Sequence, residues 1–146
     1  MNILPALFTT AAIGQQPLFE TERFTLVPLS PAKVRELAEM LLQDEALASQ
    51  IPWLEDKSRD GAAREAYGME LQAAAGQLKA WGVIARELRM HVGMIFTKNS
   101  LAGIDVEVLV ASQFGGREVA DEAGDPVLDW LDDHAEVIHE FPAILH

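Results

Sequence analysis

The chain has 146 residues and a formal net charge of −12 at pH 7, and hydrophobic residues make up 49% of it. This length and apolar content suit one domain with a buried core and argue against a disordered chain. The absence of cysteine excludes a disulfide, a cysteine-based metal site and a cysteine nucleophile. The negative charge disfavours binding to nucleic acids or anionic membranes. It favours basic partners or cationic amines, although it can equally serve solubility alone.

The chain begins with an apolar leader over residues 1–14, which lacks the basic segment of a secretory signal peptide. Pro5 interrupts the leader, and it is too short to span a bilayer as a helix. We therefore predict an apolar N-terminal arm over residues 1–18, packed on the domain or on a partner, and one domain over residues 19–146. We expect a cytoplasmic protein, and an arm of this kind favours a homo-oligomer such as a dimer.

The first half of the domain is predicted to contain one strand and three helices. Alternating apolar residues predict the strand over residues 24–29. A serine and a proline, which are favoured at the N-cap and the first helical position, open a helix over Pro31–Leu42. A short helix follows over residues 45–50, and an alanine-rich helix over residues 62–77 has Gly76 as its stop signal.

The second half begins with two apolar runs, at residues 81–86 and 91–97, which predict an antiparallel hairpin. The next strand is predicted over residues 104–110. Its alternation places the valines on one face and the two acidic residues, together with Leu109, on the other.

A turn and a helix are predicted to follow this strand. The helix spans residues 119–131, with a restart at Asp125-Pro126, where the aspartate is a favoured N-cap and the proline a favoured first residue. Residues 137–145 are predicted to form a closing strand. Because strand–helix–strand units make right-handed parallel crossovers, this strand should pair in parallel with the strand before the helix.

The turn and helix after the 104–110 strand carry the pattern Q-x-x-G-R-x-V-A-x-E-A, followed by LDW at residues 128–130. This resembles the Q-x-x-G-R-G-Y-A-T-E-A…L-D-W signature of the GCN5-related N-acetyltransferases, the GNAT family. The most similar branch is the RimJ/RimL type, which acetylates the N-termini of ribosomal proteins. Upstream, ETERFTL at residues 20–26 resembles the T-E-R-L-x-L strand of that branch, and Pro52-Trp53 resembles its P-W pair. The matching residues of the turn and helix are Gln113, Gly116, Arg117, Val119, Ala120, Glu122 and Ala123.

The resemblance runs from about Glu20 to His146 and implies a fold and an activity. The fold is an α/β domain with a mixed, mainly antiparallel sheet flanked by helices, lacking the helix and strand pair that usually end the family domain. The activity is transfer of an acetyl group from acetyl-CoA, the co-substrate, to a primary amine. That amine would belong to a protein N-terminus or to a small molecule.

The family signature also implies which residues hold acetyl-CoA. A strand, a glycine-containing turn and a helix N-terminus present free backbone N–H groups, which can bind a phosphate. Arg117 could pair with a phosphate or could form a salt bridge with Asp121 or Glu122. The residues implied in cofactor binding are Val108, Leu109, Val110, Gln113, Gly115, Gly116, Arg117, Glu118, Val119 and Ala120.

Three positions depart from the family pattern. Glu118 stands where the family has Gly or Ala, and its carboxylate would repel a pyrophosphate. Gly115 replaces an aromatic residue, and Pro126 lies where the family helix is uninterrupted. The departures leave open an alternative, a catalytically inactive GNAT-like protein that acts as a protein-interaction module.

Two acidic residues of the 104–110 strand are the candidate catalytic groups. Asp105 occupies the position where this branch often has a glutamate that draws a proton from the attacking amine, and Glu107 is its neighbour on the same face. Both could instead be solvated residues on an exposed strand face. The four histidines have no metal-ligand spacing, so we predict no metal site.

Overall fold

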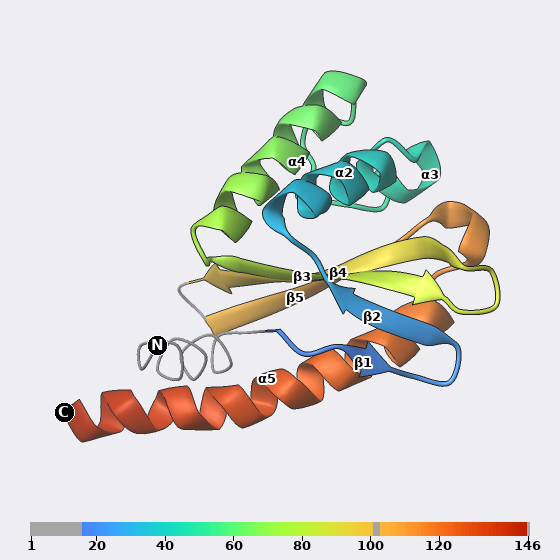
Figure 1. Cartoon of the computed structure of the whole chain (residues 1–146). Coiled ribbons are helices and arrows are strands. Elements are labelled where there is room, and N and C mark those ends of the chain that lie inside the picture. Colours follow the sequence, from blue (N-terminus) through green and yellow to red (C-terminus); the bar gives the residue numbers. More distant parts are fainter. Residues whose placement is uncertain (1–15, 101–102, 146) are drawn as a thin grey trace, which may run out of the picture.

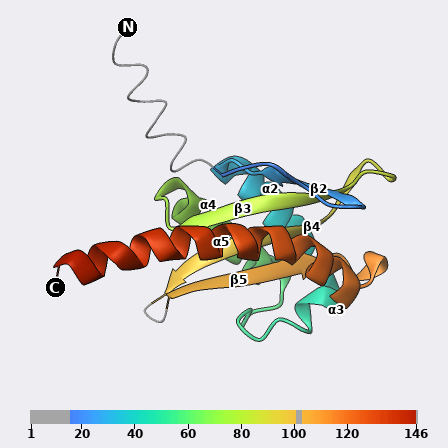
Figure 2. The same cartoon turned by 90° about the horizontal axis from the view of Figure 1, so that it is seen from below.

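The structure is a computed structural model, and it describes residues 16–100 and 103–145. The predictions for residues 1–15 of the N-terminal arm therefore lie outside the described residues. A five-stranded sheet in the order β1-β2-β3-β4-β5 forms the middle layer. Three helices, α2, α3 and α4, cover one face of the sheet, and α5 crosses the other face (Figure 1, Figure 2).

All neighbouring strands of the sheet pair antiparallel, as the sequence predicts for most of them. The two-residue strand β1 was not predicted, because it is too short to show an alternation. β5 is the last strand in the order, so its outer edge has no strand partner in the described part of the chain. The strands are β1 (Phe19–Glu20), β2 (Phe24–Pro28), β3 (Leu78–Ala85), β4 (Met90–Ser100) and β5 (Gly103–Val110).

Side-chain caps fix where the three helices of the first face begin. The side chains of Ser30, Asp44 and Ser58 each accept a hydrogen bond from a backbone N–H of the first turn. Ser58 was not read as a cap from the sequence, so the third helix begins earlier than predicted. The helices are α2 (Pro31–Leu42), α3 (Glu45–Ala48) and α4 (Arg59–Ala74).

Each face of the sheet has its own apolar core. Under α5, Trp81 is fully buried, and its ring lies 6.0 Å from that of Phe19 and 5.6 Å from that of Trp130. The valines of β5 pack in this core, whereas Leu109 packs in the core under α2 and α4. The predicted alternation of the strand is therefore confirmed.

The helix α5 (Arg117–Leu145) differs from the prediction in three ways. It does not restart at Pro126, it does not end near residue 131, and residues 137–145 are helical and do not form a strand. The expected parallel pair with β5 is therefore wrong. The run at residues 137–145 is rich in residues that favour strands, but its apolar residues also recur at helical spacing, and α5 continues past the end of the sheet (Figure 1).

Burial explains why α5 passes through a proline. Val119, Ala123 and Val127 lie four residues apart and are at most 6% exposed, and Leu131 continues the stripe. Burying one such Val or Leu side chain contributes about 1.5–3 kcal/mol. A proline inside a helix costs about 3 kcal/mol, so the stripe offsets the cost of Pro126.

We predict that Pro126→Ala raises the free energy of unfolding by about 1–3 kcal/mol, because alanine restores a helical N–H and removes the clash of the proline ring. The matched control is Pro31→Ala at the first turn of α2, where proline is well tolerated and little change is expected. Urea unfolding followed by circular dichroism measures both. A loss of stability in Pro126→Ala would contradict an uninterrupted α5.

Candidate active site

A pocket of about 380 Å³ lies at the outer edge of β5, between α3 and the N-terminus of α5. Leu47 and Gln50 form one wall, and Ser112 contributes to the loop side. The remaining lining comes from residues that the family signature implied in cofactor binding. They are Val108, Val110, Gly115, Gly116, Arg117 and Ala120.

The other four implied residues do not line this pocket. Leu109 is buried on the opposite face of β5, and Val119 is buried between α5 and the sheet. Gln113 lies in a separate groove beside α2. Glu118 is exposed in the first turn of α5, outside the pocket lining, so its charge would act on a bound anion from beside the site.

The loop between β5 and α5 turns sharply at Gly115. Its φ of +82° lies in the left-handed region, and a Cβ built there would meet no atom within 4 Å, so conformation and not space requires glycine. Two residues later α5 begins, and the N–H groups of its first turn have no carbonyl partner within the helix. The pocket therefore combines a turn with the positive end of a helix dipole, a combination that suits an anion.

Arg117 is the cation at this pocket. Among the ion pairs of the described residues, none involves Arg117, and its side chain is exposed. The expected alternatives, salt bridges from Arg117 to Asp121 or Glu122, are not among these ion pairs, and Glu122 pairs with Arg23 instead. The guanidinium of Arg117 is thus available to a phosphate.

Asp44 holds the loop in place from the side of α3. Its Oδ2 accepts hydrogen bonds from the backbone N–H and the hydroxyl of Ser112, at 2.8 and 2.9 Å, and its Oδ1 accepts one from Leu47 N–H at 3.2 Å. The backbone hydrogen bond from Ser112 is the main reason why the pKa of Asp44 lies below its usual value. One carboxylate therefore joins two walls of the pocket.

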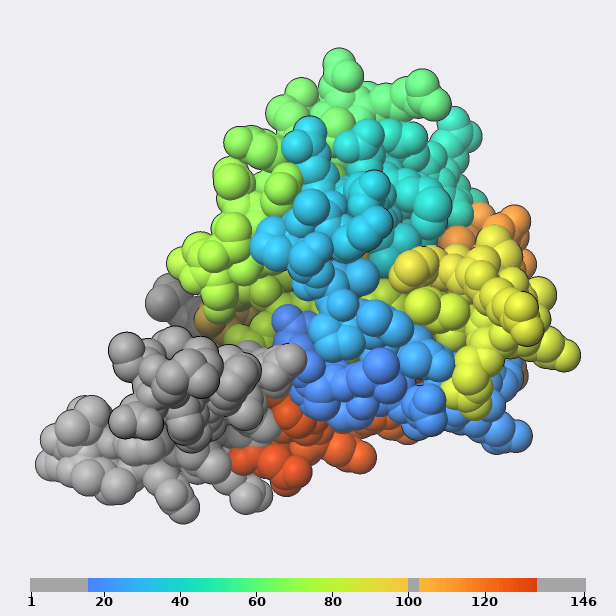
Figure 3. All heavy atoms as spheres, in the orientation of Figure 1, coloured from blue at the N-terminus to red at the C-terminus, as the bar shows by residue number. Residues whose placement is uncertain are grey.

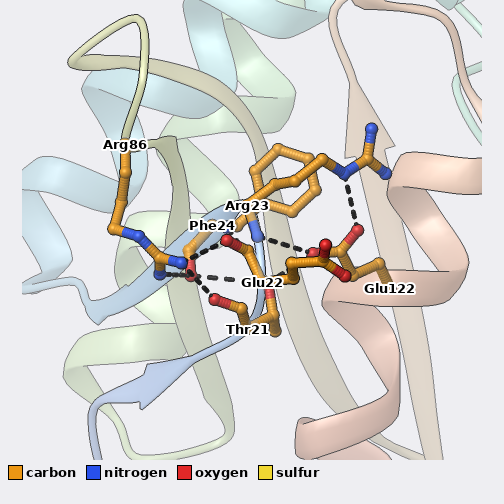
Figure 4. Close-up of polar contacts among 6 residues, drawn as sticks. All are labelled: Thr21, Glu22, Arg23, Phe24, Arg86 and Glu122. Carbon is orange, nitrogen blue, oxygen red and sulfur yellow. Dashed lines mark hydrogen bonds and ion pairs between the residues drawn. The ribbon is translucent and has the colours of Figure 1, made fainter.

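Glu122 holds the N-terminal half of α5 to the turn between β1 and β2 (Figure 4). Its Oε2 accepts hydrogen bonds from the Thr21 hydroxyl at 2.7 Å and from Arg23 N–H at 2.9 Å, and its Oε1 accepts one from Arg23 Nε at 2.7 Å. Partial burial raises the pKa of Glu122, but these hydrogen bonds lower it by more, so the net shift is downward.

Arg86 fixes the same turn from the other side. Its guanidinium donates hydrogen bonds to the carbonyl oxygens of Thr21, Glu22 and Phe24 (Figure 4). Two stretches that carry the family resemblance, residues 20–26 and the Q-x-x-G-R loop with its helix, therefore meet in space. Sequence alone identified both stretches but gave no sign that they touch.

The two candidate catalytic carboxylates lie on the α2/α4 side of β5 in different surroundings. Asp105 is exposed and lies opposite Lys98 on β4. Glu107 is half-buried and lies opposite Phe96, whose ring packs edge-on against Trp53 at 6.0 Å. The alternative of a solvated residue therefore holds for Asp105, whereas Glu107 has an apolar neighbour.

Lys98 is a residue of this region that the sequence did not single out. Its Nζ lies 5.0 Å from the centre of the Trp53 ring. Within the described residues no group of three or more histidine or acidic side chains could hold a metal ion, and no helix there is long and apolar enough to cross a membrane.

Comparison with known proteins supports the fold. No family model matches the chain, and no curated protein matches its sequence. Among solved structures, a protein described as a GnaT-family acetyltransferase from Bordetella pertussis has a TM-score of 0.56 at 20% identity, covering 81% of this chain and 72% of its own. A ribosomal-protein-S5-alanine acetyltransferase from Vibrio fischeri has a TM-score of 0.58 at 13% identity, covering 82% and 69%.

A third structure was solved with coenzyme A. It is RimL, a ribosomal L7/L12 α-N-protein acetyltransferase, with a TM-score of 0.50 at 13% identity, covering 73% of this chain and 62% of its own. The chain thus has the GNAT fold, with a mainly antiparallel sheet flanked by helices on both faces, as the sequence motifs implied.

We predict that Glu122→Gln lowers the free energy of unfolding by roughly 1–2 kcal/mol at pH 7, because two of the three hydrogen bonds engage Arg23 and only an ionised acceptor makes them charge-assisted. The pKa of Glu122 in the folded protein lies below its usual value. The stability that the ionised carboxylate contributes is therefore fully present above the usual pKa, and it is lost as the pH falls through the pKa of the folded state. The two proteins should therefore converge in stability in acid.

Asp121→Asn is the matched control, since Asp121 is the exposed neighbour of Glu122 on α5. It should change stability by less than about 0.5 kcal/mol. Thermal unfolding of the wild type, Glu122→Gln and Asp121→Asn at a series of pH values measures these differences in stability. An equal loss in both variants, or a Glu122→Gln loss that is constant with pH, would contradict the assigned role.

Proposed function

We propose that the protein is an acetyl-CoA-dependent N-acetyltransferase that acts on a primary amine. The observation that carries this proposal is the pocket at the edge of β5, where a glycine turn, a helix N-terminus and Arg117 converge. The fold supports it, because the compared structures are acetyltransferases and one of them was solved with coenzyme A. Fold alone would be insufficient, since one fold can carry many activities.

The residues of the pocket fit the chemistry of the cofactor. The first N–H groups of α5 and the guanidinium of Arg117 would hold the pyrophosphate, and Val108 and Val110 would contact the apolar arm. When bound, acetyl-CoA supplies a thioester whose carbonyl carbon an amine can attack. The outer edge of β5 has no strand partner in the described part of the chain, and backbone N–H groups along it would polarise that carbonyl.

Glu107 is the residue of the two candidates that we assign to proton removal. It lies on the strand that borders the pocket, and its cross-strand neighbour is Phe96, whose ring packs against Trp53. A positioned carboxylate can take the proton that the amine nitrogen loses as it attacks, directly or through one water. We do not assign proton removal to Asp105, because it is exposed and lies opposite Lys98.

The acceptor is proposed to be a protein N-terminus or a small amine. The net charge of −12 favours a cationic acceptor, and two of the compared proteins are named for ribosomal-protein substrates. The second candidate function is a non-catalytic protein-interaction module. One observation favours it: the carboxylate of Glu118 lies in the first turn of α5, where its negative charge would repel a bound anion.

We predict that the protein binds coenzyme A weakly and that Glu118→Gln strengthens binding about three- to tenfold, because the change removes a negative charge beside the phosphate site. Arg117→Gln should weaken binding by a similar factor, since it removes the one cation of the pocket. Isothermal titration calorimetry with coenzyme A measures all three proteins.

Asp121→Asn serves as the control for Glu118→Gln, because it removes one acidic charge from the exposed side of the same helix, one turn further from the loop. It should change affinity less than twofold. Absence of binding in every variant would favour the interaction module. Equal and tight binding by the wild type and Glu118→Gln would contradict the proposed repulsion.

We predict that Glu107→Gln lowers kcat for acetyl transfer about 100-fold while the affinity for coenzyme A is unchanged, because only proton removal is lost. Asp105→Asn should lower kcat less than fivefold. Release of free coenzyme A from acetyl-CoA in the presence of a basic peptide provides the assay. The assignment fails if Asp105→Asn is the more damaging change.

A further inference from the structure

A second hollow of the described structure is larger than the pocket at β5. It is a groove of about 800 Å³ between α2, the β3–β4 hairpin and the short helix η1 (Ser112–Phe114), on the face seen in Figure 3. The lining is mainly apolar, and the exposed Met40 and Met90 come from opposite walls, α2 and β4. The apolar residues of the groove are Leu29, Leu37, Met40, Leu41, Met90, Ala111 and Phe114.

A β-bulge places His91 at this groove. The strand register shifts between Val83 and Ile84, so that Val83 pairs with Gly93 and Ile84 with His91. The bulge brings the ring of His91 over Gly82, where a Cβ would lie 2.5 Å from His91 Nε2. Because glycine leaves this space empty, the ring of His91 lies across the sheet and forms part of the groove wall.

The charges of the groove sum to a negative value. Lys33 forms an ion pair with Glu36, with its Nζ 3.1 Å from the carboxylate. Burial is the main cause, and the charge of Lys33 the second, that holds the pKa of His91 below its usual value, so the imidazole is neutral at pH 7. Asp44 is ionised and takes part in none of the ion pairs among the described residues. A carboxylate with no cationic partner among these ion pairs therefore stands at the end of an apolar groove, where it also accepts the hydrogen bonds from Ser112 and Leu47.

We propose that this groove is a binding site for a small amphipathic cation, an ammonium group on an apolar body. The ammonium would be placed near Asp44 and Gln43, and the apolar body would contact the two methionines and Phe114. Methionine side chains are flexible and polarisable, so they suit ligands of varied shape. An anion is disfavoured, since the one lysine of the groove already has its carboxylate partner.

This site is separate from the active site proposed above and does not depend on it. Glu107 lies four residues before Ala111 of the groove wall, about 13 Å along an extended strand. The two hollows share one residue, Ser112, whose N–H and hydroxyl are held by Asp44. An ammonium at Asp44 would thus bind next to the hydrogen bonds that position the cofactor loop.

The chain offers its own probes for a direct test by NMR. Methionines labelled with ¹³C at the methyl group report on the groove through Met40 and Met90, while the buried Met69 and Met94 serve as internal references. The ligand is hexylammonium, compared with hexanol and hexanoate. We expect hexylammonium to shift the Met40 and Met90 signals with a Kd of about 1 mM, and the other two compounds to bind at least tenfold more weakly.

Variants separate the role of charge from that of folding. Asp44→Asn should weaken hexylammonium at least tenfold, and Met40→Arg, which changes an exposed side chain and leaves the Asp44 hydrogen bonds intact, should do the same. Glu65→Gln is the matched control, because it removes a charge from α4, outside the groove lining, and should change the Kd less than twofold. Correct folding of each variant is verified by the unchanged Met69 and Met94 signals.

Three outcomes would overturn the proposal. They are no shift of Met40 and Met90 up to about 10 mM hexylammonium, binding of hexanol or hexanoate as tight as that of hexylammonium, and full retention of binding in Met40→Arg.

Discussion

The burial of one stripe of α5 on the sheet is the constraint on which the other features depend. Val119, Ala123, Val127 and Leu131 cover the face that contains Trp81, and this packing carries the helix through Pro126. Because the helix is fixed there, its first turn must lie at the end of β5. The short loop between them is then confined to the edge of the sheet, where it borders the pocket.

Two carboxylates complete the placement of this loop. Asp44 holds Ser112 from the side of α3, and Glu122 holds α5 to the turn after β1. Both have a pKa below the usual value, so both are ionised near neutral pH. A protein with an excess of negative charge thus uses some of its acidic residues as acceptors for backbone and hydroxyl donors.

The same elements create two hollows of different character on the two sides of the loop. The pocket at β5 has helix N–H groups and Arg117, which suit an anion, whereas the groove beside α2 has methionines and Asp44, which suit a cation with an apolar body. Ser112 belongs to both walls. A change on one side of the loop can therefore reach the other through a single residue and its hydrogen bonds.

The sequence by itself determined the local elements and the family of the fold. Capping at Ser30, the alternation of β5 and the spacing of the Q-x-x-G-R motif depend on near neighbours in the chain, so α2, β5 and the GNAT architecture could be predicted. The extent of α5 could not be predicted, because packing against the sheet outweighed the helix-breaking tendency of Pro126. Tertiary structure also decided that Glu122 meets Thr21 and Arg23, and that a bulge brings His91 to a groove beside α2. These contacts join residues far apart in the chain, and no local pattern of residues encodes them.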